Sequence, residues 1–196
     1  ILAEMGVADS YYSDKKYGEA ELAYNDFMNL HPTNENVPYV IYQIGMCHYN
    51  QIQTIDRDQT ETLRAKREFE RLIARFPGSK FTFLAEARLK ECRQKLADHE
   101  FYVGEFYFKR KKYKAAFKRF ETISKDYANL GLDYKVNYYL VETARLMSEE
   151  DMKKRKEEAK QKEKERRARE KAEAKAKAKE EKEKQKEKEK ETITAR

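Results

Sequence analysis

Residues 15–32 read KKYGEAELAYNDFMNLHP and residues 111–128 read KKYKAAFKRFETISKDYA, so a similar segment, called the repeated phrase below, occurs twice in the chain. A third version lies between them. In order, the matching positions hold Tyr17, Ala20, Tyr24, Phe27 and Pro32; Thr62, Ala65, Phe69, Leu72 and Pro77; and Tyr113, Ala116, Phe120, Ile123 and Ala128. Internal repeats of this kind indicate a small structural unit that stacks on copies of itself.

Each repeat is expected to be a pair of helices. Apolar residues recur at spacings of three and four, and the chain has only 3 Pro and 6 Gly, which favours helices throughout. Two helices approach closely only where a side chain is small. The small residues are Ala8, Gly45 and Gly104 in the first helices and Ala20, Ala65 and Ala116 in the second. Large rings at the position of Tyr24 are expected to fill the gap towards the next repeat. The pattern predicts an all-α fold, a tetratricopeptide-repeat superhelix (α-solenoid) with a long charged C-terminal helix or tail.

The repeat domain is expected at residues 1–148 and a Lys/Glu-rich tail at residues 149–196. Within the domain we expect repeats at about 1–34, 37–79 and 97–130, a long helix at about 81–110 and a closing helix at 131–148. No Gly or Pro separates residues 81–97 from the third repeat, so residues 81–110 are expected to form one helix of about 45 Å or two nearly coaxial helices. Residues 51–62, QIQTIDRDQTET, insert extra chain into the second repeat.

The tail carries the chain's net positive charge. Residues 153–191 consist of 19 Lys or Arg, 12 Glu, 6 Ala and 2 Gln, while the whole chain has a formal net charge of +7. The repeat domain is therefore close to neutral, and its composition does not indicate a nucleic-acid-binding protein. The tail residues are strong helix formers, which leaves either a solvated lone helix or a disordered tail. By charge it could contact anionic lipid, lipopolysaccharide or nucleic acid, or it could serve as a spacer.

The sequence holds no recognisable catalytic arrangement. His31, His48 and His99 have no Cys or carboxylate partner at the spacing of a metal site or a catalytic triad. Phosphate-binding glycine loops are also absent from the sequence. We therefore expect no enzyme, catalytic residue, metal or cofactor. Cys47 and Cys92 fall on apolar helix faces and are expected to be two buried thiols, with a single bridge as the alternative.

The first helices of such repeats line the inner face of the stack. In the first two repeats, the inner positions include Tyr12, Tyr39, Tyr42, Met46 and Tyr49. In the third repeat they include Phe101, Glu105 and Phe108. Rings supply large contact areas at low entropic cost and suit peptides that are rich in apolar side chains. The alternative is that neighbouring helices bury several of these rings.

Four strings carry a resemblance to a known family. They are LHPTNENVPYVIYQIG (30–45), IDRDQT (55–60), AKREFERLIARFPGSKF (65–81) and AEARLKECRQKLADHEFYVGEFYFKRKKYKAAFKRF (85–120). The IDRDQT insertion and the run of Leu96, Ala97, Glu100 and Val103 set them apart from generic tetratricopeptide repeats. On these strings the chain resembles the BamD (ComL/YfiO) family, lipoproteins of the machine that assembles β-barrels in the bacterial outer membrane.

The resemblance implies a non-catalytic scaffold or receptor on the periplasmic face of the cell outer membrane, without nucleic acid as a partner. It also implies a lipid anchor at an upstream cysteine and at least one further N-terminal repeat. Nascent outer-membrane proteins, recognised by an aromatic C-terminal signal, would bind the N-terminal repeats, which assigns the substrate groove to Tyr12, Tyr39, Tyr42, Met46 and Tyr49. The barrel subunit BamA would dock on the C-terminal repeats, beside other lipoproteins of the complex. The family motif A-x-x-R-[FV]-E matches Ala116, Arg119, Phe120 and Glu121, and the docking set is Phe101, Glu105, Phe108, Arg119 and Glu121.

Two other functions are compatible with helical repeats. One is a different periplasmic scaffold of the type that coordinates the Tol–Pal system, which would lack the IDRDQT insertion and the long helix. The other is a cytosolic adaptor whose basic tail binds nucleic acid or acidic chaperone tails. The upstream sequence would separate these hypotheses: a lipobox cysteine favours the assembly scaffold, and a signal peptide without lipidation favours the Tol–Pal type.

Overall fold

The computed structural model describes the backbone of residues 2–194 and the side chains of residues 2–171. Within these residues the chain forms seven helices and no strand. The helices are α1 (Leu2–Ser13), α2 (Tyr17–Leu30), α3 (Val37–Tyr49), α4 (Thr60–Arg75), α5 (Lys80–Lys109), α6 (Tyr113–Asp126) and α7 (Asp133–Thr194). No helix in the described part of the chain is both long enough and apolar enough to cross a membrane.

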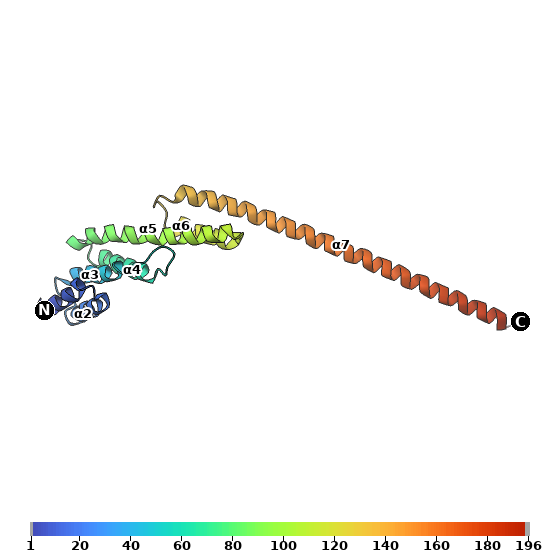
Figure 1. Cartoon of the computed structure of the whole chain (residues 1–196), viewed down its shortest axis with the longest axis horizontal. Helices are drawn as coiled ribbons and strands as arrows, with labels where there is room; N and C mark the ends of the chain where they lie inside the picture. Colours follow the sequence, from blue (N-terminus) through green and yellow to red (C-terminus); the bar gives the residue numbers. More distant parts are fainter. Residues whose placement is uncertain (1, 195–196) are drawn as a thin grey trace. The chain divides into compact units, whose positions relative to one another are not determined.

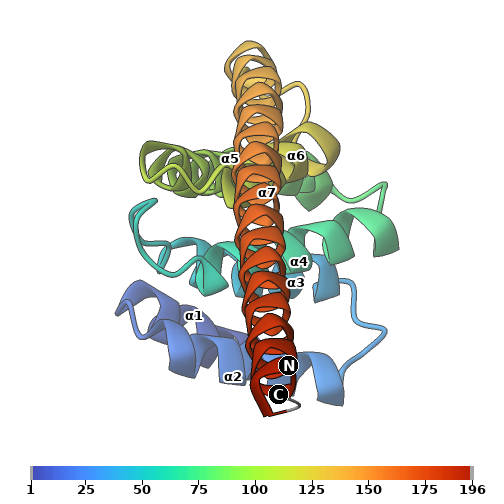
Figure 2. The same cartoon turned by 90° about the vertical axis from the view of Figure 1, so that its right-hand side faces the viewer.

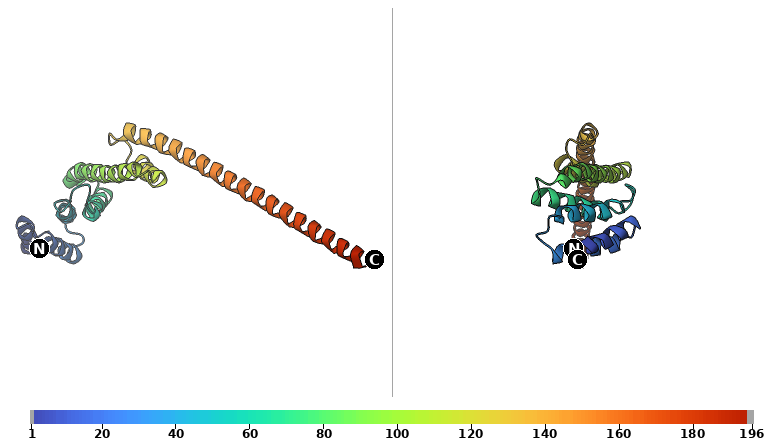
Figure 3. Two further views of the ribbon diagram at one scale, coloured as in Figure 1. Left: turned by 45° about the vertical axis from the view of Figure 1, so that its right-hand side comes forward. Right: turned by 90° about the vertical axis from the view of Figure 1, so that its left-hand side faces the viewer.

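The first six helices pack as consecutive pairs. α1 packs on α2, α3 on α4 and α5 on α6, and each pair also contacts the next along the chain. Figure 2 shows the pairs as three layers in sequence order, and Figure 3 shows the same layers from two further sides. This arrangement confirms the predicted all-α tetratricopeptide-type fold.

The repeated KKY phrase is the turn between the paired helices. Lys15 has φ 61° and Lys111 has φ 58°, so both adopt the left-handed conformation that ends a helix. In each turn the amide of this lysine donates to the carbonyl three residues back, and the next amide donates five residues back, to Tyr11 or Tyr107, at 2.9 Å. Tyr17 and Tyr113 then begin the second helices. The phrase recurs because the same turn is built twice.

The second pair replaces this turn with the inserted loop. Gln59 is buried at the end of the loop, and its Nε2 donates to the carbonyls of Thr54 and Arg57, both at 3.0 Å. Its Oε1 accepts from the hydroxyl of Thr62 at 2.8 Å. One side chain therefore satisfies the loop carbonyls and ties the loop to the first turn of α4.

Small residues lie where the paired helices cross, as predicted. Ala8, Ala20, Ala65 and Ala116 have no exposed surface. A Cβ at Gly45 would lie 2.6 Å from Cε1 of Phe69, and one at Gly104 would lie 2.8 Å from Cε1 of Phe120. These two rings therefore lie on the glycine of their own repeat. The expectation that a ring at the position of Tyr24 reaches towards the next repeat is confirmed for Tyr24 itself, whose ring lies 6.5 Å from that of Tyr39 in α3. Phe120 stacks on Tyr139 of the closing helix α7 at 4.7 Å.

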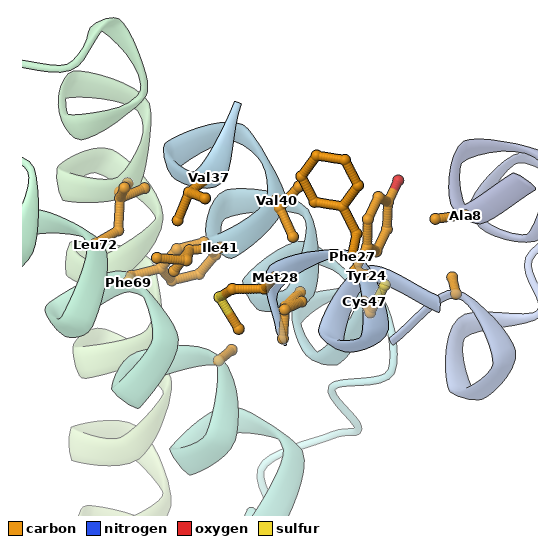
Figure 4. Close-up of a cluster of buried hydrophobic side chains, with 14 of the residues drawn as sticks. Ala8, Tyr24, Phe27, Met28, Val37, Val40, Ile41, Cys47, Phe69 and Leu72 are labelled. Carbon is orange, nitrogen blue, oxygen red and sulfur yellow. The ribbon is translucent and has the colours of Figure 1, made fainter. Parts of the chain in front are cut away.

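The buried side chains form two clusters. In the first, Val37 and Ile41 of α3 meet Phe69 and Leu72 of α4 (Figure 4), and Ala85 and Cys92 of α5 complete it. The second cluster joins Ala97 of α5 to α6 and α7, with Ala116, Phe120, Ile123 and Val136 as its buried members. α5 is one unbroken helix over Lys80–Lys109 and belongs to both clusters. Of the two alternatives for this stretch, the structure has the single helix.

α7 crosses the boundary between two compact units, which divide the chain after Ala144. In the first unit, Val136 and Thr143 of α7 are buried, Tyr139 is half-buried and Ala144 is exposed. The second unit, from Arg145 onward, is the rest of α7, a continuous helix coloured orange to red in Figure 1. Of the two states expected for the tail, the structure describes the helix.

Candidate functional site

An open pocket of about 600 Å³ lies among the helices that line the inner face. Its walls come from α1, from the start of α3 and from the first turn of α5. The lining residues are Met5, Asp9, Glu35, Asn36, Tyr39, Ser79, Lys80 and Phe81. Ser79 caps α5 by accepting a hydrogen bond from the amide of Phe81 at 3.2 Å, so the cap fixes the turn that carries Phe81.

A shared carboxylate fixes one wall of the pocket. Asp9 Oδ1 accepts from the hydroxyl of Tyr39 at 2.7 Å and from the hydroxyl of Tyr24 at 2.5 Å. Gln43 Nε2 in turn donates to the Tyr39 hydroxyl at 2.8 Å. Burial raises the pKa of both Tyr24 and Tyr39, and the hydrogen bonds to Asp9 act in the same direction. The polar edge of Tyr39 is thus satisfied within the protein, and its ring lines the pocket.

Phe81 joins the aromatic residues of α3. Its ring lies 5.4 Å from that of Tyr39 and 5.9 Å from that of Tyr42, whose other neighbour is Phe69 at 5.9 Å. Lys80 places its ammonium 5.1 Å from the centre of the Phe81 ring. The pocket therefore combines apolar ring surface with one cation, Lys80, and two carboxylates, Asp9 and Glu35.

The other predicted groove residues lie outside this pocket. Tyr12 packs against Tyr17 at 5.6 Å, and its hydroxyl accepts from Asn50 Nδ2 at 2.7 Å. Tyr49 donates to Glu91, and Arg88 stacks on the Tyr49 ring at 5.2 Å. Met46 is half-buried against the first cluster.

Of the five predicted groove residues, Tyr39 lines the pocket and Tyr42 backs it through Phe81. Sequence reasoning missed Phe81 and Lys80. The available signal was an aromatic residue two positions after a helix-capping serine, in the string PGSKF.

The predicted docking residues fall into two groups, and the first group holds α7 in place. Phe101 and Phe108 contact the ring of Tyr139 at 5.6 and 5.1 Å. Glu105 accepts from the Tyr139 hydroxyl at 2.9 Å, which, with burial, raises the pKa of that tyrosine. Phe101, Glu105 and Phe108 are all half-buried under the closing helix.

The second group lies on α6. Arg119 Nη1 is 3.0 Å from both carboxylate oxygens of Glu100, with 42% of the Arg119 side chain and 18% of the Glu100 side chain exposed. Glu121 pairs with Lys125 at 2.8 Å. Glu100 also borders a pocket of about 250 Å³ between the inserted loop and α5, where His99 Nδ1 lies 2.6 Å from the carbonyl oxygen of Ile55. Arg119 is therefore held half-exposed, beside the surface that the insertion builds.

The histidines contact groups that are distant in sequence. His48 Nδ1 lies 2.7 Å from Glu61 of α4 and His48 Nε2 lies 3.5 Å from Glu21 of α2, so the buried imidazole joins three helices. His31 Nε2 lies 2.8 Å from Glu4. These carboxylates lie on other helices, so spacing along the sequence could not indicate the contacts. Among the described side chains, no group of three or more His, Cys, Asp or Glu could hold a metal ion.

Both cysteines are free and fully buried. Burial raises the pKa of the Cys47 and Cys92 thiols to about 12 in each case. The structure thus has the two buried thiols rather than the bridge, and neither thiol is activated as a nucleophile.

Comparison with known proteins agrees with this architecture. A protein of Rickettsia prowazekii named outer membrane protein assembly factor BamD is 31% identical over 153 residues, which are 78% of this chain and 61% of that protein. Its namesake in Neisseria meningitidis serogroup B is 31% identical over 137 residues, 65% of this chain and 51% of that protein. The one in Vibrio cholerae is 27% identical over 128 residues, 60% and 53% respectively. The chain thus spans between about half and three fifths of the length of these relatives.

The match to a family covers more of the chain than the match to each of these three relatives. Residues 2–160 match the YfiO family, described as outer membrane lipoprotein. The matched range covers all three helix pairs, the inserted loop and the start of the charged part of α7. This chain is therefore a member of the YfiO family of outer membrane lipoproteins.

Proposed function

We propose that this chain is a non-catalytic scaffold for the assembly of outer-membrane β-barrel proteins. Its family and its relatives, which are named outer membrane protein assembly factors, support this role and an outer-membrane location. Membrane attachment would come from a lipid anchor upstream of this sequence. The family match includes the IDRDQT insertion and argues against the Tol–Pal type of scaffold and the cytosolic adaptor.

The pocket at α1, α3 and α5 is the proposed site for nascent outer-membrane proteins. Tyr39 and Phe81 offer ring faces to an aromatic side chain, and Lys80 offers a cation to a terminal carboxylate. Tyr42 supports Phe81 from behind. Outside the pocket, α1 carries Tyr12 and α3 carries Met46 and Tyr49. These side chains would contact the part of the nascent protein that extends from the pocket, and a hydrogen bond to Glu91 holds Tyr49 in position.

The half-exposed pair of Arg119 and Glu100 is the observation that carries the docking of a partner subunit. Arginine can bind two carboxylate oxygens at once, and Glu100 holds this one ready at the surface. We assign Arg119 and Glu121 to direct contact with a periplasmic domain of the barrel subunit BamA. Phe101, Glu105 and Phe108 would act indirectly, by fixing α7 beside that surface. Other lipoproteins of the complex are further proposed partners.

The test is capture of the purified barrel subunit's periplasmic domains by wild type, by Arg119→Glu and by a matched control, Arg71→Glu. Arg71 is 40% exposed and pairs with Glu68, which is 17% exposed, so the two arginines have nearly the same surroundings. We expect Arg119→Glu to weaken capture at least about tenfold, since a reversed charge at an interface costs several kcal/mol, and Arg71→Glu to change it little.

Two outcomes would count against the proposal in different ways. If wild type captures no barrel subunit, the scaffold function is wrong. If both variants bind like wild type, the scaffold stands and the role of Arg119 is wrong. Circular dichroism of each variant shows whether the repeats remain folded.

A further inference from the structure

The positive charge of α7 is not spread evenly along the helix. Residues 153–171 contain 11 Lys or Arg and 5 Glu, whereas residues 172–191 contain 8 Lys and 7 Glu. The second stretch is nearly balanced, as expected of a lone helix that acts only as a spacer. The excess of positive charge in residues 153–171 is not explained by a role as a spacer.

Within residues 153–171 the basic side chains form a row along one face of the helix. The members of this basic row are Lys153, Lys156, Lys160, Lys164, Arg167 and Lys171. Their spacings of three and four keep them within about 80° of the helix circumference and over about 27 Å of its length. All six are exposed. None of the five glutamates falls inside the row, although Glu157 and Glu163 border it.

Little within the protein neutralises the basic row. Among the described side chains, Arg167 alone of the six has a carboxylate partner, Glu163 at 2.6 Å. Like charges at spacings of three and four repel each other and destabilise a helix. A spacer gains nothing from such a row, whereas an anionic surface along this face would relieve the repulsion. The row therefore points to a negatively charged partner.

The residue types narrow the class of partner. Residues 153–171 contain only Lys, Arg, Glu, Ala and Gln. No aromatic residue is available to stack on nucleic acid bases, and no large apolar residue is available to enter the acyl chains of a bilayer. What remains is adsorption by charge, as polybasic segments adsorb on anionic lipids. Membership of an outer membrane lipoprotein family places phospholipid phosphates close to the chain.

We propose that the basic row of α7 binds the surface of a membrane through the phosphates of anionic phospholipids, with the helix lying on the headgroups. The proposal rests on the family and on the charge distribution, and not on the proposed role in barrel assembly. Because the Debye length is about 8 Å at physiological salt, only the side chains next to the surface contribute. The position of a charge should then matter as well as the net charge.

The test is co-sedimentation of the full chain with vesicles of phosphatidylcholine alone or with added phosphatidylglycerol, at low and at physiological salt. The row variant carries Lys156→Gln, Lys160→Gln and Lys164→Gln. The matched control carries Lys154→Gln, Arg155→Gln and Lys162→Gln, which removes the same charge from exposed positions of the same stretch that lie at least about 80° outside the row. We expect binding to anionic vesicles only, reduced at least about tenfold in the row variant and less than about threefold in the control.

Conservative replacement separates charge from helix formation. Lys→Arg at residues 156, 160 and 164 should bind like wild type, and circular dichroism should show unchanged helix content in all variants. If the row variant and the control lost vesicle binding equally, the role of the basic row would be wrong. If the wild type did not bind anionic vesicles, the proposed membrane partner would be wrong. Tighter binding to a short DNA duplex than to the vesicles, at the same salt, would also overturn it.

Discussion

At the scale of single residues, contacts between a glycine and a ring set how closely the two helices of a pair pack. Gly45 leaves room for Phe69 and Gly104 leaves room for Phe120, and both rings are fully buried. The first pair has Ala8 at the equivalent position. Gly18, by contrast, lies on the exposed face of α2 with nothing within 4 Å of the site of a Cβ. The chain therefore offers a buried helical glycine that is needed and an exposed one that is not.

Gly45→Ala should lower the free energy of unfolding by about 1–3 kcal/mol, because the added Cβ would meet the buried Phe69 ring. Gly18→Ala should raise it by about 0.4–1 kcal/mol, because alanine restricts the unfolded chain and fits a helix. Urea unfolding followed by near-UV circular dichroism measures both, since that signal reports the packed tyrosines and phenylalanines. Equal effects of the two substitutions would contradict the close contact at Gly45.

At the scale of elements, local features were predictable and contacts between distant elements were not. The KKY turns depend on neighbouring residues alone, so the same short motif forms the same turn at Lys15 and at Lys111. Phe81 reaches Tyr39 across more than forty residues, and no periodicity links the first turn of α5 to the start of α3. Tyr139 lies within the predicted closing helix, but its stacking on Phe120 depends on how α7 meets α6.

The first turn of α5 provides the functional prediction at this scale. Phe81→Ala should weaken binding of a short peptide that ends in phenylalanine with a free carboxylate at least about tenfold, because the substitution removes a ring from the pocket wall. Phe83→Ala is the matched control, since Phe83 is 76% exposed and does not line the pocket. Fluorescence anisotropy of the labelled peptide measures both affinities.

A second peptide with an amidated C-terminus tests the contribution of Lys80 in the same assay. Weaker binding of the amidated peptide to wild type is expected, because the amide has no negative charge to pair with Lys80. If Phe83→Ala reduced affinity as much as Phe81→Ala, the pocket would not be the binding site.

At the scale of the whole folded unit, buried acidic groups make stability depend on pH. The pKa values of Cys47 and Cys92 are raised to about 12 by burial, and those of Tyr24 and Tyr39 are raised for the same reason. In the unfolded chain the thiols ionise near pH 9, so above that pH the unfolded state binds fewer protons than the folded state. The contribution of these groups is complete below pH 9 and is lost as the pH rises towards 12.

The free energy of unfolding should therefore fall by about 1–3 kcal/mol between pH 8 and pH 10. Urea midpoints at intervals of half a pH unit measure the decline. The double variant Cys47→Ala and Cys92→Ala should show a much flatter dependence over this range, because the two thiols are then absent. A wild-type midpoint that stays constant to pH 10 would contradict the burial of free thiols.

Because α5 runs without a break from Phe81 past Glu100, it fixes the angle about the helix axis between the proposed substrate pocket and the proposed docking surface. The two residues are separated by roughly 28 Å along the axis. Inserting a single residue between them would turn one surface by about 100° relative to the other, and no hinge in the helix could absorb the rotation. A longer loop elsewhere in this protein would leave the angle between the two surfaces unchanged. A residue inserted into α5 would instead rotate the bound substrate relative to the docked partner subunit.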